Sequence, residues 1–140
     1  MQINDNEALS HGIELFRQSK WHREYKVEDI YRYLIAPIKN NKIILYYQHK
    51  KPIGLVTWCW LSKQDGQKFL SNNYYITEND YLLNTGEELW GIEFIAPYGN
   101  VRQVMNLIKK EHSVVYSHNK KVHWRRLHEP SKRHTRELKT

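Results

Sequence analysis

A single carboxylate interrupts an apolar, strand-like stretch of this 140-residue chain. The stretch covers residues 89–97, Leu-Trp-Gly-Ile-Glu-Phe-Ile-Ala-Pro, and Glu93 is its one charged residue. Burying a carboxylate without a partner costs several kcal/mol or shifts its pKa upward, so buried carboxylates are normally hydrogen-bonded, ion-paired or used chemically. The fold must therefore bring something to Glu93 that stabilises it or uses it.

The residues after this stretch predict a strand–turn–helix unit. Pro97 and Gly99 end the strand, and Asn100 is placed to cap a helix over residues 101–110, whose apolar residues recur on one face. Active-site groups often collect where a strand passes into a helix.

Periodicity elsewhere predicts the remaining elements. A first helix is expected after a cap at Ser10, ending near residues 18–19, and further helices over residues 27–35 and 79–83. Strands are expected over residues 42–48, 53–62, 113–117 and 122–127. Residues 49–52 are expected to join the first two strands as a hairpin, the second helix to end before Pro37, and the chain beyond residue 127 to be frayed. This order predicts one α/β or α+β domain, with one layer of helices on a mostly antiparallel sheet.

Composition restricts the setting in which the chain works. Cys59 is the only cysteine, which excludes an internal disulfide framework and fits a reducing cytosol. No leader-like or membrane-spanning run is present, so a cytoplasmic protein without an integral membrane segment is expected. The net charge is +7, and residues 119–140 carry eight Lys or Arg against two Glu, which accounts for +6 of it.

Three motifs together resemble a known family. They are the loop Trp21-His22-Arg23, the Gly-x-x-x-Trp strand from Gly54 to Trp58 with Leu-Ser following at 61–62, and the run from Trp90 to Gly99. Over about residues 8–125 the chain resembles the lysine acyltransferases that activate RTX toxins. The resemblance implies a GNAT-like fold with an acyltransferase-like region 1–118 and a basic C-terminal strand or tail 119–140. It also implies transfer of a fatty acyl group from acyl carrier protein to internal lysines of a protoxin.

The same resemblance assigns the catalytic residues. The catalytic histidine of the family falls on His22, and its catalytic aspartate falls on Glu93. The pairing makes physical sense, because a neutral imidazole can take a proton from an attacking amine or hydroxyl while a carboxylate fixes its tautomer and stabilises the imidazolium.

The chain also departs from the family pattern. Glu93 replaces the aspartate, Tyr33 stands where an asparagine is common, and Ala36-Pro37 reverses a Pro-Ala pair. These departures suit a smaller branch that acts in microcin maturation, in which the protein and a partner join a glucosylated catecholate siderophore to the C-terminus of a bacteriocin precursor. Fatty acylation of lysine is the default expectation, and a homodimer or hetero-complex is expected in either case.

The turn at residues 97–100 has one glycine, whereas free acyl-CoA is normally held by a Gly-rich loop before a helix. No cofactor site and no CoA site are therefore expected, and the donor is expected to be carrier-bound. An acidic carrier protein would meet the basic tail favourably.

Three other classes of function compete with this interpretation. Basic and aromatic residues at 120–126 suggest nucleic-acid binding, which we do not expect because the charge is confined to the tail. His118, His123, His128 and His134 suggest a metal site, but their spacings fit no common ligand pattern, so none is expected. The third class is a binding subunit without catalytic activity.

Overall fold

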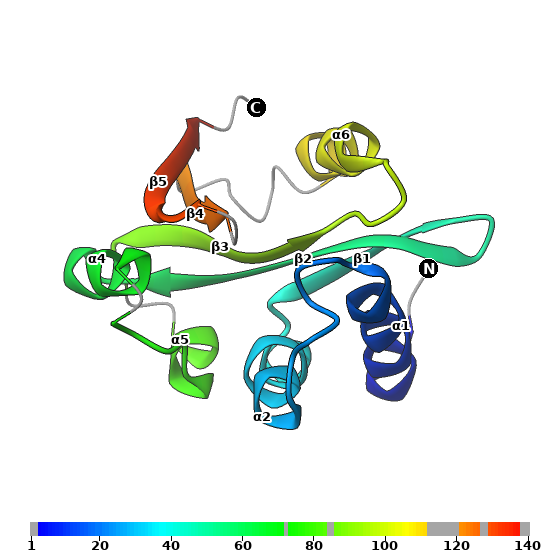
Figure 1. Cartoon of the computed structure of the whole chain (residues 1–140), viewed down its shortest axis with the longest axis horizontal. Coiled ribbons are helices and arrows are strands. Elements are labelled where there is room, and N and C mark those ends of the chain that lie inside the picture. The colour runs from blue at the N-terminus through cyan, green and yellow to red at the C-terminus, as the bar shows by residue number, and fades with distance from the viewer. Residues whose placement is uncertain (1–2, 72, 84–85, 112–120, 127–128, 138–140) are drawn as a thin grey trace.

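The computed structural model describes residues 3–71, 73–83, 86–111, 121–126 and 129–137. One five-stranded sheet runs through it, with the strands in chain order from edge to edge (Figure 1). The strands are β1 (Ile43–Gln48), β2 (Lys51–Leu61), β3 (Glu88–Ile95), β4 (Lys121–Arg126) and β5 (Glu129–Glu137). Neighbouring strands are antiparallel except the parallel β3–β4 pair, which confirms the expected α+β domain with a mixed, mostly antiparallel sheet.

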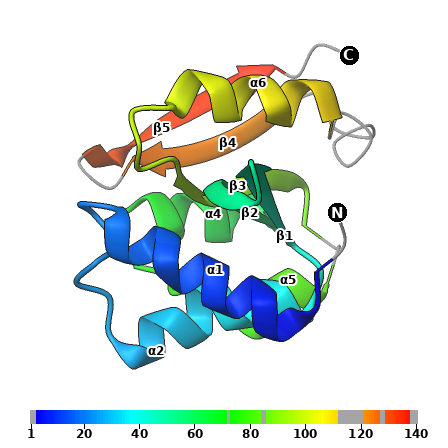
Figure 2. The same ribbon diagram turned by 90° about the vertical axis from the view of Figure 1, so that its right-hand side faces the viewer.

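Helices cover both faces of this sheet. The helical elements are α1 (Asp5–Gln18), α2 (Val27–Ile30), the π-helix η1 (Tyr31–Ile35), α3 (Ala36–Lys39), α4 (Lys63–Leu70), α5 (Glu78–Leu82) and α6 (Val101–Glu111). The helices α1, α2 and α5 lie on one face, and α6 lies on the other (Figures 1 and 2). The expectation of one helical layer is therefore wrong. Its physical reason is that β2 is buried on both sides, with Leu55 packed towards α1 and Trp58 packed with residues of α6.

The first helix begins earlier than expected. Asn4 caps it, since the Asn4 side-chain oxygen accepts a hydrogen bond from the Glu7 backbone N–H at 2.8 Å. Ser10 therefore lies inside the helix and does not start it. Buried Ala8 lies upstream of Ser10, so packing extends the helix beyond the boundary that its polar residues indicate.

The second helical segment continues past Pro37, where it was expected to end. Residues Tyr31–Ile35 form a π-helix, in which the Ala36 N–H bonds the Tyr31 carbonyl five residues back. Pro37 then lies in the first turn of α3, where a missing N–H costs nothing. The wide turn thus carries the helical backbone on to Lys39.

Three further boundaries differ from expectation. The hairpin is confirmed, but its turn is only His49-Lys50, both at positive φ (51° and 66°), as tight two-residue hairpins require. Helix α4 was missed in a polar segment, although Ser62 caps it by accepting from the Asp65 N–H. Residues 129–137 form a strand where frayed chain was expected. The expected strand at 113–117 and residue 127 lie outside the described residues.

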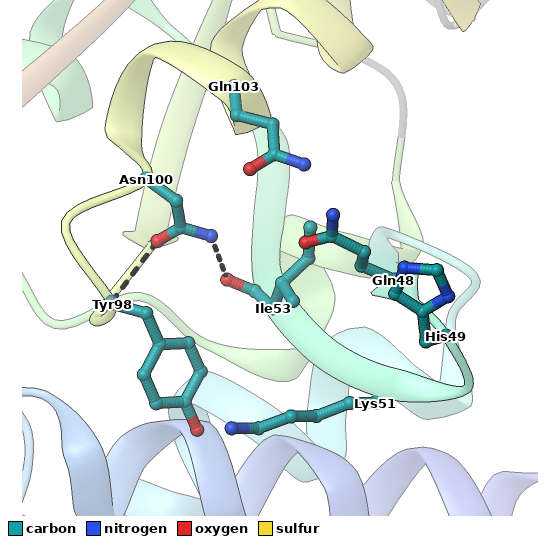
Figure 3. A pocket seen from close by; sticks show the side chains of 7 residues that line it. All are labelled: Gln48, His49, Lys51, Ile53, Tyr98, Asn100 and Gln103. Atoms are coloured by element: carbon teal, nitrogen blue, oxygen red, sulfur yellow. Dashed lines mark hydrogen bonds between the residues drawn. The ribbon is translucent and has the colours of Figure 1, made fainter.

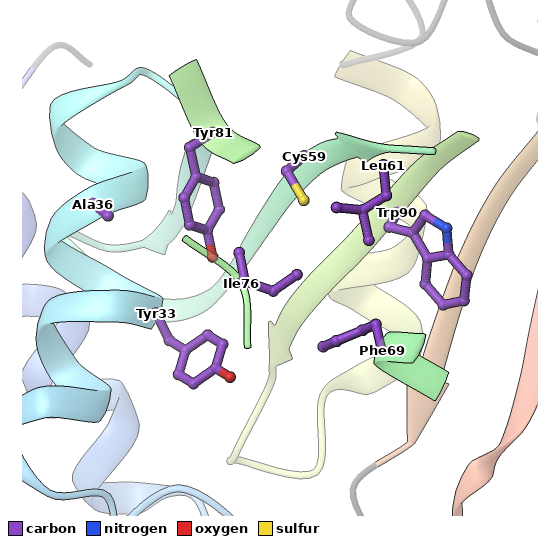
Figure 4. Close-up of a cluster of buried hydrophobic side chains, with 8 residues drawn as sticks. All are labelled: Tyr33, Ala36, Cys59, Leu61, Phe69, Ile76, Tyr81 and Trp90. Carbon is purple, nitrogen blue, oxygen red and sulfur yellow. The ribbon is translucent and has the colours of Figure 1, made fainter. Parts of the chain in front are cut away.

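The core next to the helical layer is largely aromatic (Figure 4). One cluster contains Tyr33, Ala36, Cys59, Leu61, Phe69, Ile76, Tyr81 and Trp90. Cys59 is fully buried, as its place in an apolar strand predicts. In the described part of the chain, no helix is long and apolar enough to span a membrane.

Candidate active site

A bulge in β3 turns Glu93 towards the helical layer. Val56 pairs with Phe94 but Trp58 pairs with Gly91, so Ile92 and Glu93 together lie opposite Thr57. Two residues opposite one is the arrangement of a β-bulge, which re-aims side chains. Ile92 packs against the Tyr33 cluster and Glu93 contacts His22 on the same face, whereas Phe94 returns to the α6 side. The Thr57 hydroxyl holds the bulge by accepting from the Glu93 N–H at 3.0 Å.

The partner of Glu93 is His22, from the loop after α1. His22 Nε2 and Glu93 Oε2 lie 2.5 Å apart, although the two residues are 71 positions apart in the chain. Each residue is only 4% exposed. Two turns position the histidine, because the His22 N–H donates to the Ser19 carbonyl and the Tyr25 N–H donates to the His22 carbonyl. The structure thus brings the two predicted site residues into direct contact, while their catalytic role stays a prediction.

Ser19 occupies the other nitrogen of the imidazole. Its hydroxyl lies 2.5 Å from His22 Nδ1, and the residue is 8% exposed. With an ionised Glu93, the tautomer that satisfies both contacts carries its proton on Nε2 and accepts from Ser19 at Nδ1. The result is a hydroxyl–imidazole–carboxylate chain with Nδ1 as the available base. Ser19 was not predicted as a site residue, although its three-residue spacing from His22 at a helix end was a usable signal.

Two tyrosines surround the carboxylate. Tyr25 Oη donates to Glu93 Oε1 at 2.9 Å, and the Tyr25 ring lies 5.8 Å from the Tyr33 ring, centroid to centroid. Burial raises the Tyr25 pKa far above its usual value, and the charge of Glu93 adds to the effect. Burial and Glu93 likewise raise the pKa of Tyr33. Both hydroxyls therefore stay protonated at neutral pH and remain donors.

Arg125 reaches the same region from β4. Its guanidinium donates to the Phe69 carbonyl at 2.6 Å and lies 3.9 Å from the Phe69 ring centroid. Burial lowers the Arg125 pKa, whereas the neighbouring Tyr33 and Glu93 raise it. From the sequence, this arginine was expected only as part of the basic tail. The parallel pairing of β3 with β4, which turns it towards the cluster, could not be inferred from local sequence.

The strands β3 and β4 pair beside this site. Their described register contains only the pairs Leu89 with Val122 and Trp90 with His123, although β3 continues to Ile95. Continuing the register would set Arg125 next to Ile92, on the face that carries Glu93.

The histidines of the tail do not gather into a metal site within the described ranges. There, no three His, Cys, Asp or Glu side chains are arranged to hold a metal ion. His123 packs against Trp90, with ring centroids 5.5 Å apart, and lies 3.8 Å from Glu88. His118 and His128 are outside the described residues, and the side chain of His134 is not described.

A separate open pocket of about 450 Å³ lies where the β1–β2 hairpin meets the start of α6 (Figure 3). Asn100 directly precedes α6, as expected of its cap, and its carbonyl accepts from the Val104 N–H at 3.0 Å. Its side chain joins two segments: the amide donates to the Ile53 carbonyl at 2.9 Å and accepts from the Tyr98 N–H at 3.1 Å. The Lys51 ammonium lies 4.3 Å from the Tyr98 ring centroid. Neither His22 nor Glu93 lines this pocket, so it is distinct from the candidate site.

The fold and this site combine a mixed sheet with a buried histidine–carboxylate pair, an arrangement that is chemically able to support general-base catalysis. The chain belongs to the RTX toxin acyltransferase family, whose family model matches residues 1–139. This confirms the resemblance drawn from the three motifs.

Individual relatives agree with this family. The chain is 29% identical over 101 residues to the lysine-acyltransferase RtxC of Vibrio cholerae, covering 71% of this chain and 65% of that protein. It is 26% identical over 112 residues to the protein-lysine myristoyltransferase HlyC of Escherichia coli, covering 79% and 63% respectively. An uncharacterized protein of Synechocystis, sll0720, is 29% identical over 111 residues, covering 76% and 74%. The chain thus spans slightly less than two thirds of either acyltransferase.

Proposed function

We propose that the chain is an acyltransferase that modifies a protein or peptide toxin, moving a fatty acyl group from acyl carrier protein to a lysine side chain. The observation that carries this proposal is the His22–Glu93 contact, 2.5 Å between Nε2 and Oε2, in a chain of the RTX toxin acyltransferase family. Relatives named as lysine acyltransferases support the choice of acceptor.

The contacts suggest a route for the proton. A neutral lysine amine attacks the thioester carbonyl carbon and forms the C–N bond, while its proton passes through the Ser19 hydroxyl to His22 Nδ1. Glu93 accepts from Nε2 and stabilises the imidazolium that forms. Collapse of the tetrahedral intermediate breaks the C–S bond, and the proton returns to the leaving thiolate. The products are an amide on the acceptor and a free carrier thiol.

The short pairing of β3 with β4 supports a carrier-borne donor. Beyond Trp90 the edge of β3 that faces β4 has no ladder partner within the described register. An extended arm with amide groups can hydrogen-bond such an edge as an added strand does. The single glycine of the 97–100 turn agrees with a donor other than free CoA, and the basic tail would attract an acidic carrier.

Siderophore transfer in microcin maturation is the second candidate, favoured by the same departures as before, Glu93 and Tyr33. Fatty acyl transfer and siderophore transfer would both use His22 as the base, and the two reactions differ in the mass of the group transferred. Intact-mass measurement of the acceptor therefore separates them directly.

The test uses the purified chain with myristoyl-acyl carrier protein and candidate toxin precursors, followed by intact-mass analysis. We expect a fatty acyl increment that disappears in His22→Ala. The matched control is His49→Asn, because His49 is an exposed histidine at positive φ, a conformation that asparagine tolerates. If folded His22→Ala still supports maturation of the toxin, the chain acts as a binding subunit and the catalytic proposal fails. Light scattering of the same samples tests the expected homodimer or hetero-complex.

A further inference from the structure

Acyl transfer needs a group that the His22–Glu93 pair does not provide. When the amine attacks the thioester, negative charge develops on the carbonyl oxygen, and enzymes stabilise this oxyanion with fixed donors. The hydroxyls nearest Glu93 are largely committed: Tyr25 donates to Glu93 and Ser19 contacts His22. The hydroxyl of Tyr81 is fully buried, in the interior of the core.

The Tyr33 hydroxyl is different. Tyr33 is 9% exposed and its ring lies beside that of Tyr25, tilted by 48°, but its hydroxyl makes no hydrogen bond to another residue within the described ranges. It projects from η1 towards the sheet side of the aromatic cluster (Figure 4). Its pKa is raised, first by burial and then by Glu93, so the hydroxyl keeps its proton. A protonated hydroxyl donor without a described acceptor therefore lies beside Tyr25, the residue that hydrogen-bonds to Glu93.

Arg125 brings positive charge to the same aromatic cluster. The Phe69 carbonyl and ring fix its guanidinium, and Phe69 belongs to the same core cluster as Tyr33. The parallel β3–β4 pairing turns Arg125 to the face that carries Glu93. A guanidinium in a partly dry site strengthens any nearby hydrogen bond to an anion.

We propose that Tyr33 donates a hydrogen bond to the oxyanion formed during acyl transfer, and that Arg125 supports this with its positive charge. The inference rests on the acyl transfer proposed above. As the amine nitrogen bonds to the carbonyl carbon, the electron pair of the C=O bond moves to the oxygen, which Tyr33 Oη–H then contacts. When the C=O bond re-forms, the C–S bond breaks and the thiolate leaves. Tyr33 is thus a catalytic residue, and Arg125 acts by positioning charge beside it.

The first test is Tyr33→Phe, measured as initial rates of thioester loss from myristoyl-acyl carrier protein with an acceptor that the wild-type protein modifies. We expect kcat to fall about 100- to 1,000-fold with KM little changed, as for the loss of one oxyanion donor. The thermal midpoint should stay close to wild type, because the lost hydroxyl has no described partner. Tyr31→Phe is the matched control: Tyr31 lies in the same π-helix, and its hydroxyl contacts Glu78 at the exposed surface.

The second test separates charge from packing at Arg125. Arg125→Lys keeps the charge and is expected to retain more activity than Arg125→Gln, with kcat rather than KM carrying the difference. Lys109→Gln, which removes an exposed charge on α6 outside the basic tail, is expected to leave kcat unchanged.

The outcomes distinguish the two proposals. One outcome is that His22→Ala abolishes transfer while folded Tyr33→Phe keeps kcat within about twofold of wild type. A twofold loss is far smaller than the loss expected for one oxyanion donor. In that case acyl transfer stands and the oxyanion role of Tyr33 is overturned. If the wild-type protein transfers nothing above the His22→Ala background, the proposed function fails and the oxyanion role falls with it.

Discussion

Shortening Glu93 by one methylene tests the geometry of the site most directly. Glu93→Asp preserves the charge but withdraws the carboxylate by one C–C bond, about 1.5 Å. The His22 Nε2 to carboxylate distance is 2.5 Å, so it would grow to about 4.0 Å unless the backbone moved. The Tyr25 contact, now 2.9 Å, would be lost in the same way. The aspartate common in relatives is thus expected to work poorly in this backbone.

The expected loss follows from these distances. A misplacement of about 1 Å in a catalytic group can cost on the order of 100-fold in rate, so Glu93→Asp should lose at least that in kcat. Each buried polar group left without a partner should also cost roughly 1–3 kcal/mol of unfolding free energy. Glu93→Gln provides the comparison, because it keeps the reach of the side chain and removes its charge.

Rates of transfer from myristoyl-acyl carrier protein and urea unfolding of the same samples measure both effects. Glu93→Asp should lose activity and stability together, whereas Glu93→Gln should lose activity with a smaller change in stability. If Glu93→Asp kept half or more of the wild-type rate, the conclusion that kcat depends on the distance between the carboxylate and His22 would be refuted.

Three further predictions follow from other contacts. Tyr25→Phe removes the donor to Glu93 Oε1 and should lower kcat roughly tenfold, the rate equivalent of one charge-assisted hydrogen bond. Because burial raises the folded-state pKa of Tyr25 and Tyr81 above 10.0, the stability they contribute is present below pH 10.0 and lost above it, by about 1.4 kcal/mol per pH unit for each tyrosine. Urea unfolding from about pH 9 to about pH 11 should show this decline. Gly54→Ala should cost roughly 1–3 kcal/mol in urea unfolding, since the new Cβ would lie 2.9 Å from the Ile95 carbonyl oxygen.

Each of these has a control. Tyr31→Phe removes a hydroxyl that does not contact Glu93 and should leave kcat unchanged; an equal loss in both variants would contradict the role given to Tyr25. Tyr25→Phe should also flatten the alkaline decline, and an unaltered slope would show that other groups cause it. Gly91→Ala is the comparison for Gly54→Ala, because its Cβ would meet its nearest atom only at 3.8 Å. Equal destabilisation by both alanines would mean that close approach is not the cause.

Local patterns were sufficient for much of the fold. The strand around Glu93, the helix after Asn100 and the hairpin at His49 were all predicted, because each is written in periodicity and turn residues within a short window. The helix through Pro37 was not, since a π turn depends on packing and has no local signature. The strand β5 was also missed, because polar residues conceal strands whose stability comes from pairing with a neighbour.

Only part of the candidate site could be predicted from the sequence. His22 and Glu93 were paired through motif resemblance, and 71 residues of separation make that contact inaccessible to local reasoning. Ser19 and Tyr25 lie within three residues of His22, yet only the turn geometry shows that their hydroxyls converge on the pair. Arg125 needed the parallel β3–β4 pairing, which is a property of the whole sheet.

The bulge opposite Thr57 has a consequence for changes in chain length. Before the bulge the even-numbered residue Trp90 faces the helical layer, and after it the odd-numbered residue Ile95 does. Deleting Ile92 would remove the bulge, so that side chains alternate regularly between the two faces along β3, and Glu93 would stay on the face of the helical layer. The deletion would nevertheless draw the carboxylate back along the strand by one residue step, about 3.3 Å, twice the retreat caused by aspartate. The distance between the acid and its histidine is therefore encoded in the count of residues along β3 as much as in their identity.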